Sequence, residues 1–242
     1  MRREHFEVGE TAATIVAEER FISEARASIF RSRETVQRFI GRDPVFRVTL
    51  EPYLCPDDAP PLIRRMCSAA SKAGVGPMAA VAGAIAEQAV ADMREAGATQ
   101  AVVDNGGDIA LLLDRDTAVG LYAGERVQGI GFLCRPREGI FGICTSSATI
   151  GPSISFGISD AATVISPDVV LADACATRLG NLLTSDREEV MAAALNDVCS
   201  IAGVEGAVAV VGDKMAFKGR LPELARVAVP AGRISRIEVP TL

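Results

Sequence analysis

The chain has 242 residues, with 25 Lys and Arg against 31 Asp and Glu, and its net charge is −6 at neutral pH. This acidic balance argues against a nucleic-acid binder, because such proteins usually present a basic face. Its single histidine, His5, excludes most mechanisms built on imidazole, including Ser-His-Asp triads and metal sites with two or more histidines. Chemistry in this chain would therefore depend on carboxylates, hydroxyls, backbone groups or a metal held by oxygen atoms.

Cysteine usage and the N-terminal sequence both favour a cytoplasmic protein. None of the cysteines is in a Cys-x-x-Cys motif, and we expect all of them to be reduced thiols. The N-terminus has no apolar signal core, and the alanine-rich run over 78–91 is too short and too weakly apolar to span a bilayer. The cysteines are Cys55, Cys67, Cys134, Cys144, Cys175 and Cys199.

The first quarter of the chain predicts two strands and a helix ahead of a proline-rich segment. Apolar residues at helical spacing run from Ile22 to Ile40, and Gly41 ends the helix. Alternating Phe46, Val48 and Leu50 favour a strand with one buried face. A linker or crossover loop would join a subregion of residues 1–60 to the rest of a single domain that spans 1–242. The expected segments are a strand over 12–18, a helix over 22–40, a strand over 46–50 and the linker over 51–61, which holds four prolines.

Two helices follow, separated by a glycine-rich break. The first runs from Leu62 to Ala73, and Gly74-Val75-Gly76 ends it. Pro77 opens the second at a position where its missing N–H costs nothing, and an apolar stripe continues to Met93. Gly83 within this stripe predicts close packing against another backbone.

From Ala101 onward the pattern changes to that of a sheet. Short apolar runs are separated by turn residues, and Gly212-Asp213-Lys214 predicts a hairpin. Clustered strands and helices, rather than strict alternation, favour an α+β fold in which antiparallel or mixed sheets pack against helices. The expected strands are 102–103, 109–113, 119–123, 130–134, 140–145, 149–156, 207–211, 215–217, 226–229 and 235–239, and the expected helices are 168–183 and 188–199.

Asp173 and Thr177 are the strongest candidates for a functional site. They are four residues apart in a run that predicts a helix, so their side chains should stack on one face among small neighbours. Aspartate is unfavourable inside a helix, and no lysine follows Asp173 at the i+4 position to explain it. A carboxylate beside a hydroxyl on an accessible helix face suits a hard cation or a cation bound to phosphate. The alternative is that Asp173 caps or pairs locally and Thr177 packs.

Three further segments each have a structural and a functional interpretation. Asp104-Asn105-Gly106-Gly107-Asp108 is either a tight hairpin turn or a ligand loop whose glycines expose backbone groups while Asp108 faces a ribose or base. Gly76-Pro77-Met78-Ala79-Ala80 is either an ordinary helix start or a set of free N–H groups that hold a phosphate. The segment from Cys144 to Thr149 contains four hydroxyls and is either a polar loop or the lining of a phosphate or flavin pocket.

Taken in order, these segments resemble the ApbE-like superfamily of flavin transferases. The blocks are GPMAAVAGAIAE (76–87), VDNGGDIAL (103–111), CTSS (144–147) and ATVISPDVVLADACATRLGN (162–181). ApbE enzymes have a Gly-Gly-Ile-Ala-Lys-Gly-type segment, an Asn-x-Gly-Gly-Asp segment, a Ser-Gly loop and an Ala-Asp-Ala-x-Ala-Thr helix in the same order. Across nearly its whole length the chain is more similar to an uncharacterised ApbE-related family, which shares these blocks and a C-terminal hairpin like VVGDKMAFKGRLPEL (210–224).

ApbE enzymes cleave FAD with a bound magnesium ion and attach the FMN part to a threonine of a partner protein, or they hydrolyse FAD. The resemblance implies that the side chains of Asp173 and Thr177 bind Mg²⁺, with a backbone carbonyl near Ala79 as a third protein ligand. It also implies a flavin (FAD or FMN) or another nucleotide as the small-molecule ligand and, for a transferase, a protein substrate. The implied cofactor-binding residues are Gly76, Met78, Ala79, Asn105, Gly106, Gly107, Asp108, Thr145, Ser146 and Ser147.

Two departures from the ApbE pattern keep three functions open. Ala80 or Val81 stands where the family has a lysine, and the His-Ile-Ile-Asp-Pro-type segment before the metal helix is absent. The alternatives are a Mg²⁺-dependent flavin transferase or pyrophosphate hydrolase, a non-catalytic protein that binds a flavin, nucleotide or other anionic cofactor, and an enzyme for a different small substrate in the same pocket. No catalytic side chain is assigned. The Ala- and Gly-rich helices favour close subunit packing, as in a homodimer.

Overall fold

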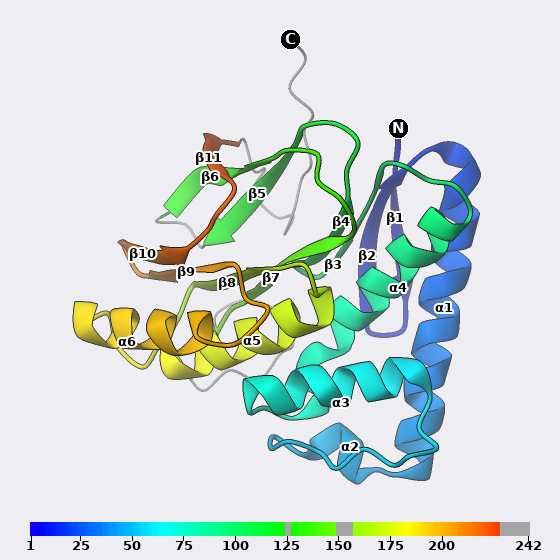
Figure 1. The fold of residues 1–242 in the computed structure, drawn as a ribbon, viewed down its shortest axis with the longest axis horizontal. Helices are drawn as coiled ribbons and strands as arrows, with labels where there is room; N and C mark the ends of the chain where they lie inside the picture. The colour runs from blue at the N-terminus through cyan, green and yellow to red at the C-terminus, as the bar shows by residue number, and fades with distance from the viewer. Residues whose placement is uncertain (124–126, 149–156, 228–242) are drawn as a thin grey trace.

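The computed structural model describes residues 1–123, 127–148 and 157–227, which form two antiparallel sheets and a layer of helices (Figure 1). The strands are β1 (Arg2–Val8), β2 (Thr11–Ala17), β3 (Ala101–Asn105), β4 (Asp108–Leu112), β5 (Thr117–Ala123), β6 (Val127–Cys134), β7 (Phe141–Ser146), β8 (Ala161–Ser166), β9 (Gly206–Val211), β10 (Lys214–Gly219) and β11 (Glu223–Arg226). Within the described residues, the larger sheet has the order β1-β2-β3-β4-β7-β8-β9-β10 and the smaller has the order β11-β6-β5. Each described strand pair is antiparallel, as the predicted α+β class allows.

Helices cover one face of the larger sheet, and the smaller sheet lies against its other face (Figure 1). The helices are α1 (Glu19–Arg42), α2 (Val45–Val48), α3 (Pro61–Ala73), the 3-10 turn η1 (Pro77–Ala80), α4 (Val81–Glu95), α5 (Val169–Leu182) and α6 (Glu188–Cys199). The α4 helix contacts β3 and β4, and the α5 helix contacts β7, β8 and α4. This arrangement brings residues 76–83, 104–108 and 169–178 to one region of the molecule.

The central strands bury alternate side chains in two separate cores, because both of their faces are covered. In β4, Ala110 and Leu112 pack with the helices, whereas Ile109 and Leu111 pack with the smaller sheet. The run from Ile109 to Leu113 is therefore continuously apolar rather than alternating. Apolar burial on both faces is what holds the two layers to the sheet.

Glycines allow α5 to lie in backbone contact with its neighbours. A Cβ added at Gly83 of α4 would lie 2.8 Å from both the Asp173 Cβ and the Val169 carbonyl oxygen. A Cβ added at Gly142 of β7 would lie 2.9 Å from the Val169 Cα. The close packing predicted at Gly83 is thus confirmed, and its partner is the first half of α5.

Most of the expected elements are observed with small shifts at their ends, but the strand predicted over 46–50 is wrong. The side chain of Asp43 accepts a hydrogen bond from the Val45 N–H at 3.0 Å, and a helical turn, α2, begins there. Only Phe46 is buried, while Val48 and Leu50 are 71% and 53% exposed, so the three side chains do not share a buried face. Apolar alternation over so short a segment does not distinguish a strand with one buried face from a helical turn in which only Phe46 is buried.

The structure adds two strands, β1 and β8, that were not predicted. Residues 149–156 and 228–242 lie outside the described residues, so the strands expected at 149–156 and 235–239 stay predictions. Of the strand expected over 226–229, Arg226 is observed as the last residue of β11. Residues 1–60 contribute β1, β2 and α1, and β2 is hydrogen-bonded to β3 in the larger sheet.

The cysteines and helices agree with the compositional expectations. All six cysteines are free thiols. No described helix has, by itself, both the length and the apolar content needed to cross a membrane. The α3 helix and the η1–α4 segment reach that threshold only in combination, and they are bent by 106° relative to each other.

Candidate functional site

Helix α5 presents the two residues whose spacing suggested a cation site. It begins at Val169 because the Asp168 side chain caps it, accepting a hydrogen bond from the Leu171 N–H at 3.1 Å. Asp173 is buried, with 7% of its surface exposed, and Thr177 is half-buried one turn further along. The predicted helix and the four-residue spacing on it are therefore observed.

Asp173 hydrogen-bonds to the start of helix α4. Its Oδ2 accepts from the Gly83 N–H at 2.7 Å, a contact between residues that are 90 positions apart in the sequence. The N-cap of α4, Ala80, has no side-chain hydrogen bond, so Asp173 supplies a carboxylate to an otherwise uncapped helix start. The alternative that Asp173 caps or pairs locally is not what this contact shows, because the helix that Asp173 caps is a neighbouring one.

Burial and like charges perturb the carboxyl groups around Asp173. Burial raises the pKa of Asp173 to about 7, and hydrogen bonds from the Gly83 and Ala82 backbone oppose this shift. The pKa of Asp108, which is half-buried, also lies well above its usual range, because of burial first and then the charges of Asp173 and Asp104. The charges of Asp173 and Asp104 thus act on Asp108, and a cation between Asp108 and Asp173 would relieve the repulsion of that pair.

The 104–108 segment is a two-residue hairpin that joins β3 to β4. Gly106 and Gly107 have φ of 71° and 103°, which only glycine adopts readily in such a turn. The Gly107 N–H donates to Asp104 Oδ1 at 2.9 Å, and its carbonyl accepts from the Thr145 N–H at 3.1 Å. The turn interpretation is confirmed, and Gly107 uses its backbone groups within the protein, whereas Gly106 is exposed.

Asn105 and Asp108 flank this turn on the helix side of the sheet. The Asn105 side-chain amide donates to the Ala82 carbonyl at 3.1 Å, which connects the hairpin to the start of α4. Asp108 is paired in register with Cys144 of β7, which packs in the helix-side core. The hairpin, the start of α4 and the middle of α5 therefore meet at Asp173.

The 76–80 segment forms a 3-10 turn that lies against α5. A Cβ added at Gly76 would collide with the Thr49 carbonyl, so packing alone requires glycine at this position. Met78 and Ala79 are half-buried, and η1 contacts α5 directly. The helix start predicted at Pro77 is observed, but the first-turn N–H of Gly83 already has an anionic partner in Asp173.

The hydroxyl-rich segment is partly a strand rather than a loop. Thr145 and Ser146 are the last two residues of β7, because their backbone pairs with β8. The Thr145 and Thr163 hydroxyls are 2.9 Å apart across this pair. Ser146 is buried and Ser147 is half-buried beyond the strand end, while Thr149 lies outside the described residues.

Two contributors to this region were not among the predicted site residues. Asp104 is buried in β3 (Ala101–Asn105), directly after three apolar residues, and a charged residue at that position was the available signal. Cys144 is fully buried, and its thiol lies 3.6 Å from the Val169 carbonyl, to which it donates. Burial raises the pKa of Cys144 well above its usual range, so it stays a thiol. Within the described residues, no group of three or more His, Cys, Asp or Glu is arranged to hold a metal on its own.

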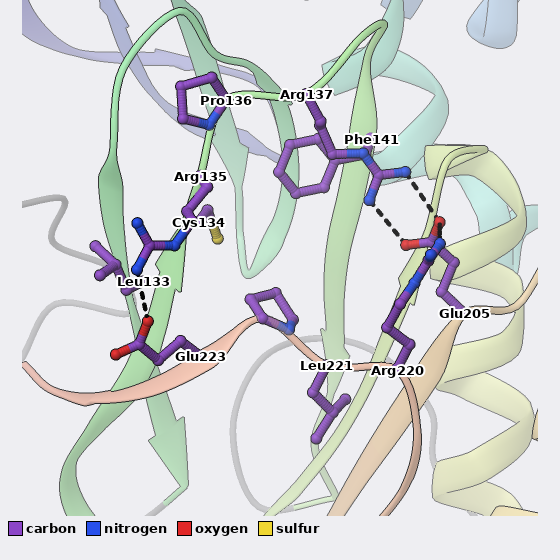
Figure 2. A pocket seen from close by; sticks show the side chains of 11 residues that line it. Leu133, Cys134, Arg135, Pro136, Arg137, Phe141, Glu205, Arg220, Leu221 and Glu223 are labelled. Atoms are coloured by element: carbon purple, nitrogen blue, oxygen red, sulfur yellow. Dashed lines mark hydrogen bonds and ion pairs between the residues drawn. The ribbon is translucent and has the colours of Figure 1, made fainter.

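A separate depression of about 250 Å³ lies where the chain crosses from the larger to the smaller sheet (Figure 2). Arg137 stacks over the Phe141 ring at 4.6 Å and donates two hydrogen bonds to Glu205, at 2.8 and 3.0 Å. Arg220 also donates to Glu205, at 2.6 Å, and Arg135 pairs with Glu223 across the depression. The arginines and glutamates of this depression therefore pair with one another. No predicted site residue lines the depression.

Comparison with known proteins identifies the family. A family model described as "AbpE bacteria" matches residues 1–200. The chain belongs to this family. It is 52% identical over 232 residues to a UPF0280 protein of Methanocella arvoryzae, covering 96% of this chain and 94% of that protein. It is also 48% identical over 242 residues to a UPF0280 protein of Methanothrix thermoacetophila, covering 98% of this chain and all of the relative.

Solved structures of ApbE proteins share the fold of this chain. The apo flavinyl transferase ApbE of Pseudomonas stutzeri aligns with a TM-score of 0.55 at 15% identity, over 90% of this chain and 94% of that one. An ApbE protein from Thermotoga maritima aligns with a TM-score of 0.54 at 12% identity, over 90% and 97% of the two chains. The expected ApbE-like fold is therefore confirmed.

Proposed function

We propose that this chain is a Mg²⁺-dependent enzyme that cleaves the pyrophosphate of FAD, releasing AMP and passing FMN to a protein hydroxyl or to water. The observation that carries the proposal is the buried Asp173 carboxyl, which interacts with the Asp108 carboxyl in a fold shared with a flavinyl transferase. The groups that oppose the raised pKa of Asp173 are backbone N–H groups rather than a basic side chain. A bound cation would supply the missing positive charge.

The available donors suit magnesium. Asp173, Thr177 and the Ala79 carbonyl are oxygen donors, and they come from α5 and from the η1 turn that contacts it. Mg²⁺ prefers oxygen and commonly takes only one or two carboxylates from the protein, with phosphates and water completing its shell. A site without three clustered acidic, histidine or cysteine ligands among the described residues agrees with such shared coordination. When bound, the ion would neutralise charge on the pyrophosphate.

The chain's own residues would orient the nucleotide around this position. The exposed Gly106 offers backbone groups to a ligand, and Asn105 fixes the hairpin against the start of α4. Thr145, Ser146 and Ser147 lie at the adjacent end of β7 and would supply hydroxyls to a phosphate or flavin. Asp173 must lose its proton to act as a ligand, and its backbone hydrogen bonds favour the ionised form.

The test is to incubate the protein with FAD and MgCl₂ and to measure AMP and FMN by chromatography. An acceptor peptide that contains threonine reports transfer. D173N keeps an oxygen that can accept from Gly83 but removes the charge, and we expect it to reduce turnover by about 100-fold or more. T177V removes the hydroxyl and should also reduce turnover. The matched control is D114N, since Asp114 accepts a hydrogen bond from Thr99 beyond the opposite end of β4. Equal turnover in wild type, D173N and T177V would refute the proposal.

A second candidate is a binding protein that holds FAD or FMN without cleaving it. The observation in its favour is that the single histidine, His5, is exposed on β1 and paired with Glu7, outside the candidate site. The 3-10 turn also ends in Ala80, where the ApbE pattern has a lysine nearby. Saturable quenching of flavin fluorescence without release of AMP would support this candidate over the enzyme.

A further inference from the structure

Helix α5 holds both ends of the segment that carries Ala79. Asp173 accepts a hydrogen bond from Gly83 in the first turn of α4, as described above. Five residues later, Arg178 Nη1 donates to the carbonyl of Ala73, the last residue of α3, at 2.9 Å. Residues 74–82 lie between these two contacts, and the η1 turn within them rests on α5.

Arg178 is itself fixed from the other side by α6. Its Nε and Nη2 donate to the two carboxylate oxygens of Asp197, at 2.5 and 2.9 Å. The pair is part-buried, and the Arg178 guanidinium lowers the pKa of Asp197. A planar guanidinium can bind a carboxylate through two parallel bonds and still donate elsewhere, which a lysine ammonium does not reproduce.

The end of α3 is shaped to receive this guanidinium. Gly74 adopts φ of 66° as the C-cap, and its N–H donates to the carbonyl oxygens of Ala70 and Ser71 within α3. A Cβ added at Gly74 would lie 2.8 Å from Arg178 Nη1. The Ala73 carbonyl is one of the last acceptors of α3, which have no partner within the helix, so the bond from Arg178 completes this helix end.

We propose that Arg178, oriented by Asp197, is a positioning residue that fixes the 74–80 segment against α5. This inference rests on the proposed function, in which the Ala79 carbonyl and the Asp173 and Thr177 oxygens act together. Because Arg178 directly follows Thr177, one contact sets the position of η1 relative to the helix turn that carries both side-chain oxygens. Loss of the contact would loosen the site without removing any ligand.

The experiment compares R178K with wild type and with R137K as a matched control. Arg137 makes the same type of part-buried bidentate pair, with Glu205, in the depression on the other face of the sheet (Figure 2). The first readout is hydrogen–deuterium exchange of peptides that cover residues 74–80. The second is the dissociation constant for Mn²⁺ in the presence of FAD, measured by electron paramagnetic resonance.

We expect R178K to exchange about tenfold faster over 74–80 and to bind Mn²⁺ about tenfold more weakly, with R137K unchanged in both. Wild-type exchange in R178K, or faster exchange with unaltered Mn²⁺ affinity, would overturn the positioning role. If R178K does not fold, D197N removes the orienting charge and gives the same comparison. If the wild-type protein binds no Mn²⁺ with FAD, the proposed function fails, whereas the exchange result still decides whether Arg178 holds the segment.

Discussion

Asp173 combines two properties that a single carboxylate rarely has together. It is nearly inaccessible to solvent, and it accepts a hydrogen bond from the start of a helix to which a negative charge is favourable. Burial nevertheless dominates, because its pKa is raised to about 7. The residue therefore caps a helix in the protein alone, and under the proposed function it would become an anionic ligand once a cation compensates its charge.

The raised pKa of Asp173 predicts an unusual pH dependence of stability. An unfolded aspartate titrates near pH 4, so the folded state holds the extra proton between about pH 4 and pH 7. The resulting contribution to stability is present below pH 4 and is lost as the pH rises toward about 7. Without metal, D173N should therefore be more stable than wild type at pH 8, by about 2 kcal/mol or more.

Urea unfolding in EDTA at pH 5 and pH 8 measures this difference. D114N serves as the control, because the pKa of Asp114 is lowered by Arg115 and Thr99 rather than raised. The same loss of stability between pH 5 and pH 8 in D173N and wild type would show that another group is responsible.

At the scale of elements, α5 organises the site through contacts with three other helices. Its Asp173 contacts the start of α4, and its Arg178 contacts the end of α3 and α6. Small residues make this possible, because Gly83 lets the α4 backbone approach Asp173 and Val169. The two helices are therefore sensitive to added volume at their crossing.

Replacing glycine by alanine should have opposite effects on stability at two helical positions, Gly83 and Gly41. G83A would place a methyl group 2.8 Å from Asp173 Cβ and the Val169 carbonyl oxygen, and we expect it to lower stability by about 1–3 kcal/mol. G41A has open space within 4 Å and lies near the end of α1, so the better helix propensity of alanine should raise stability by up to about 1 kcal/mol. Thermal and urea unfolding measure both, and a neutral G83A would show that the helices can separate without cost.

The sequence predicts the elements that depend on local spacing better than those that depend on contacts between distant residues. Local periodicity predicts α1, α3 and α5, because each has an apolar stripe or a capped, small-residue run. It misses β1, an edge strand with mainly charged residues, and β8, a short fully buried run directly before α5. The i, i+4 spacing of Asp173 and Thr177 is also local, whereas the contact from Asp173 to Gly83 spans 90 residues and requires the fold.

At the scale of the whole molecule, one large sheet carries the candidate site on one face and a second apolar core on the other. The Asp108 end of β4 lies with the helices, and its alternate residues Ile109 and Leu111 pack under the smaller sheet. The site is therefore held by a sheet that is buried on both sides. A change in the helical layer should alter the site before it alters the core between the sheets.

This arrangement predicts that ligands stabilise the folded molecule cooperatively. If Mg²⁺ shares its shell between the Asp173 carboxylate and a pyrophosphate, each component alone should bind weakly and raise the unfolding midpoint little. Together, at about 100 times the dissociation constant, they should stabilise the protein by about 2.7 kcal/mol, since only the folded state binds them. Differential scanning fluorimetry with FAD, MgCl₂ and both measures this.

D173N should abolish the combined effect. R137K should retain it, because Arg137 pairs with Glu205 on the other side of the sheet. Additive shifts from FAD and Mg²⁺ would instead indicate two independent sites. A shift with FAD that is unaffected by Mg²⁺ or by D173N would favour a flavin-binding protein, because the carboxyl at the centre of α5 would then make no contribution to ligand binding. The size of the synergy therefore measures how directly this carboxyl and the pyrophosphate share one cation.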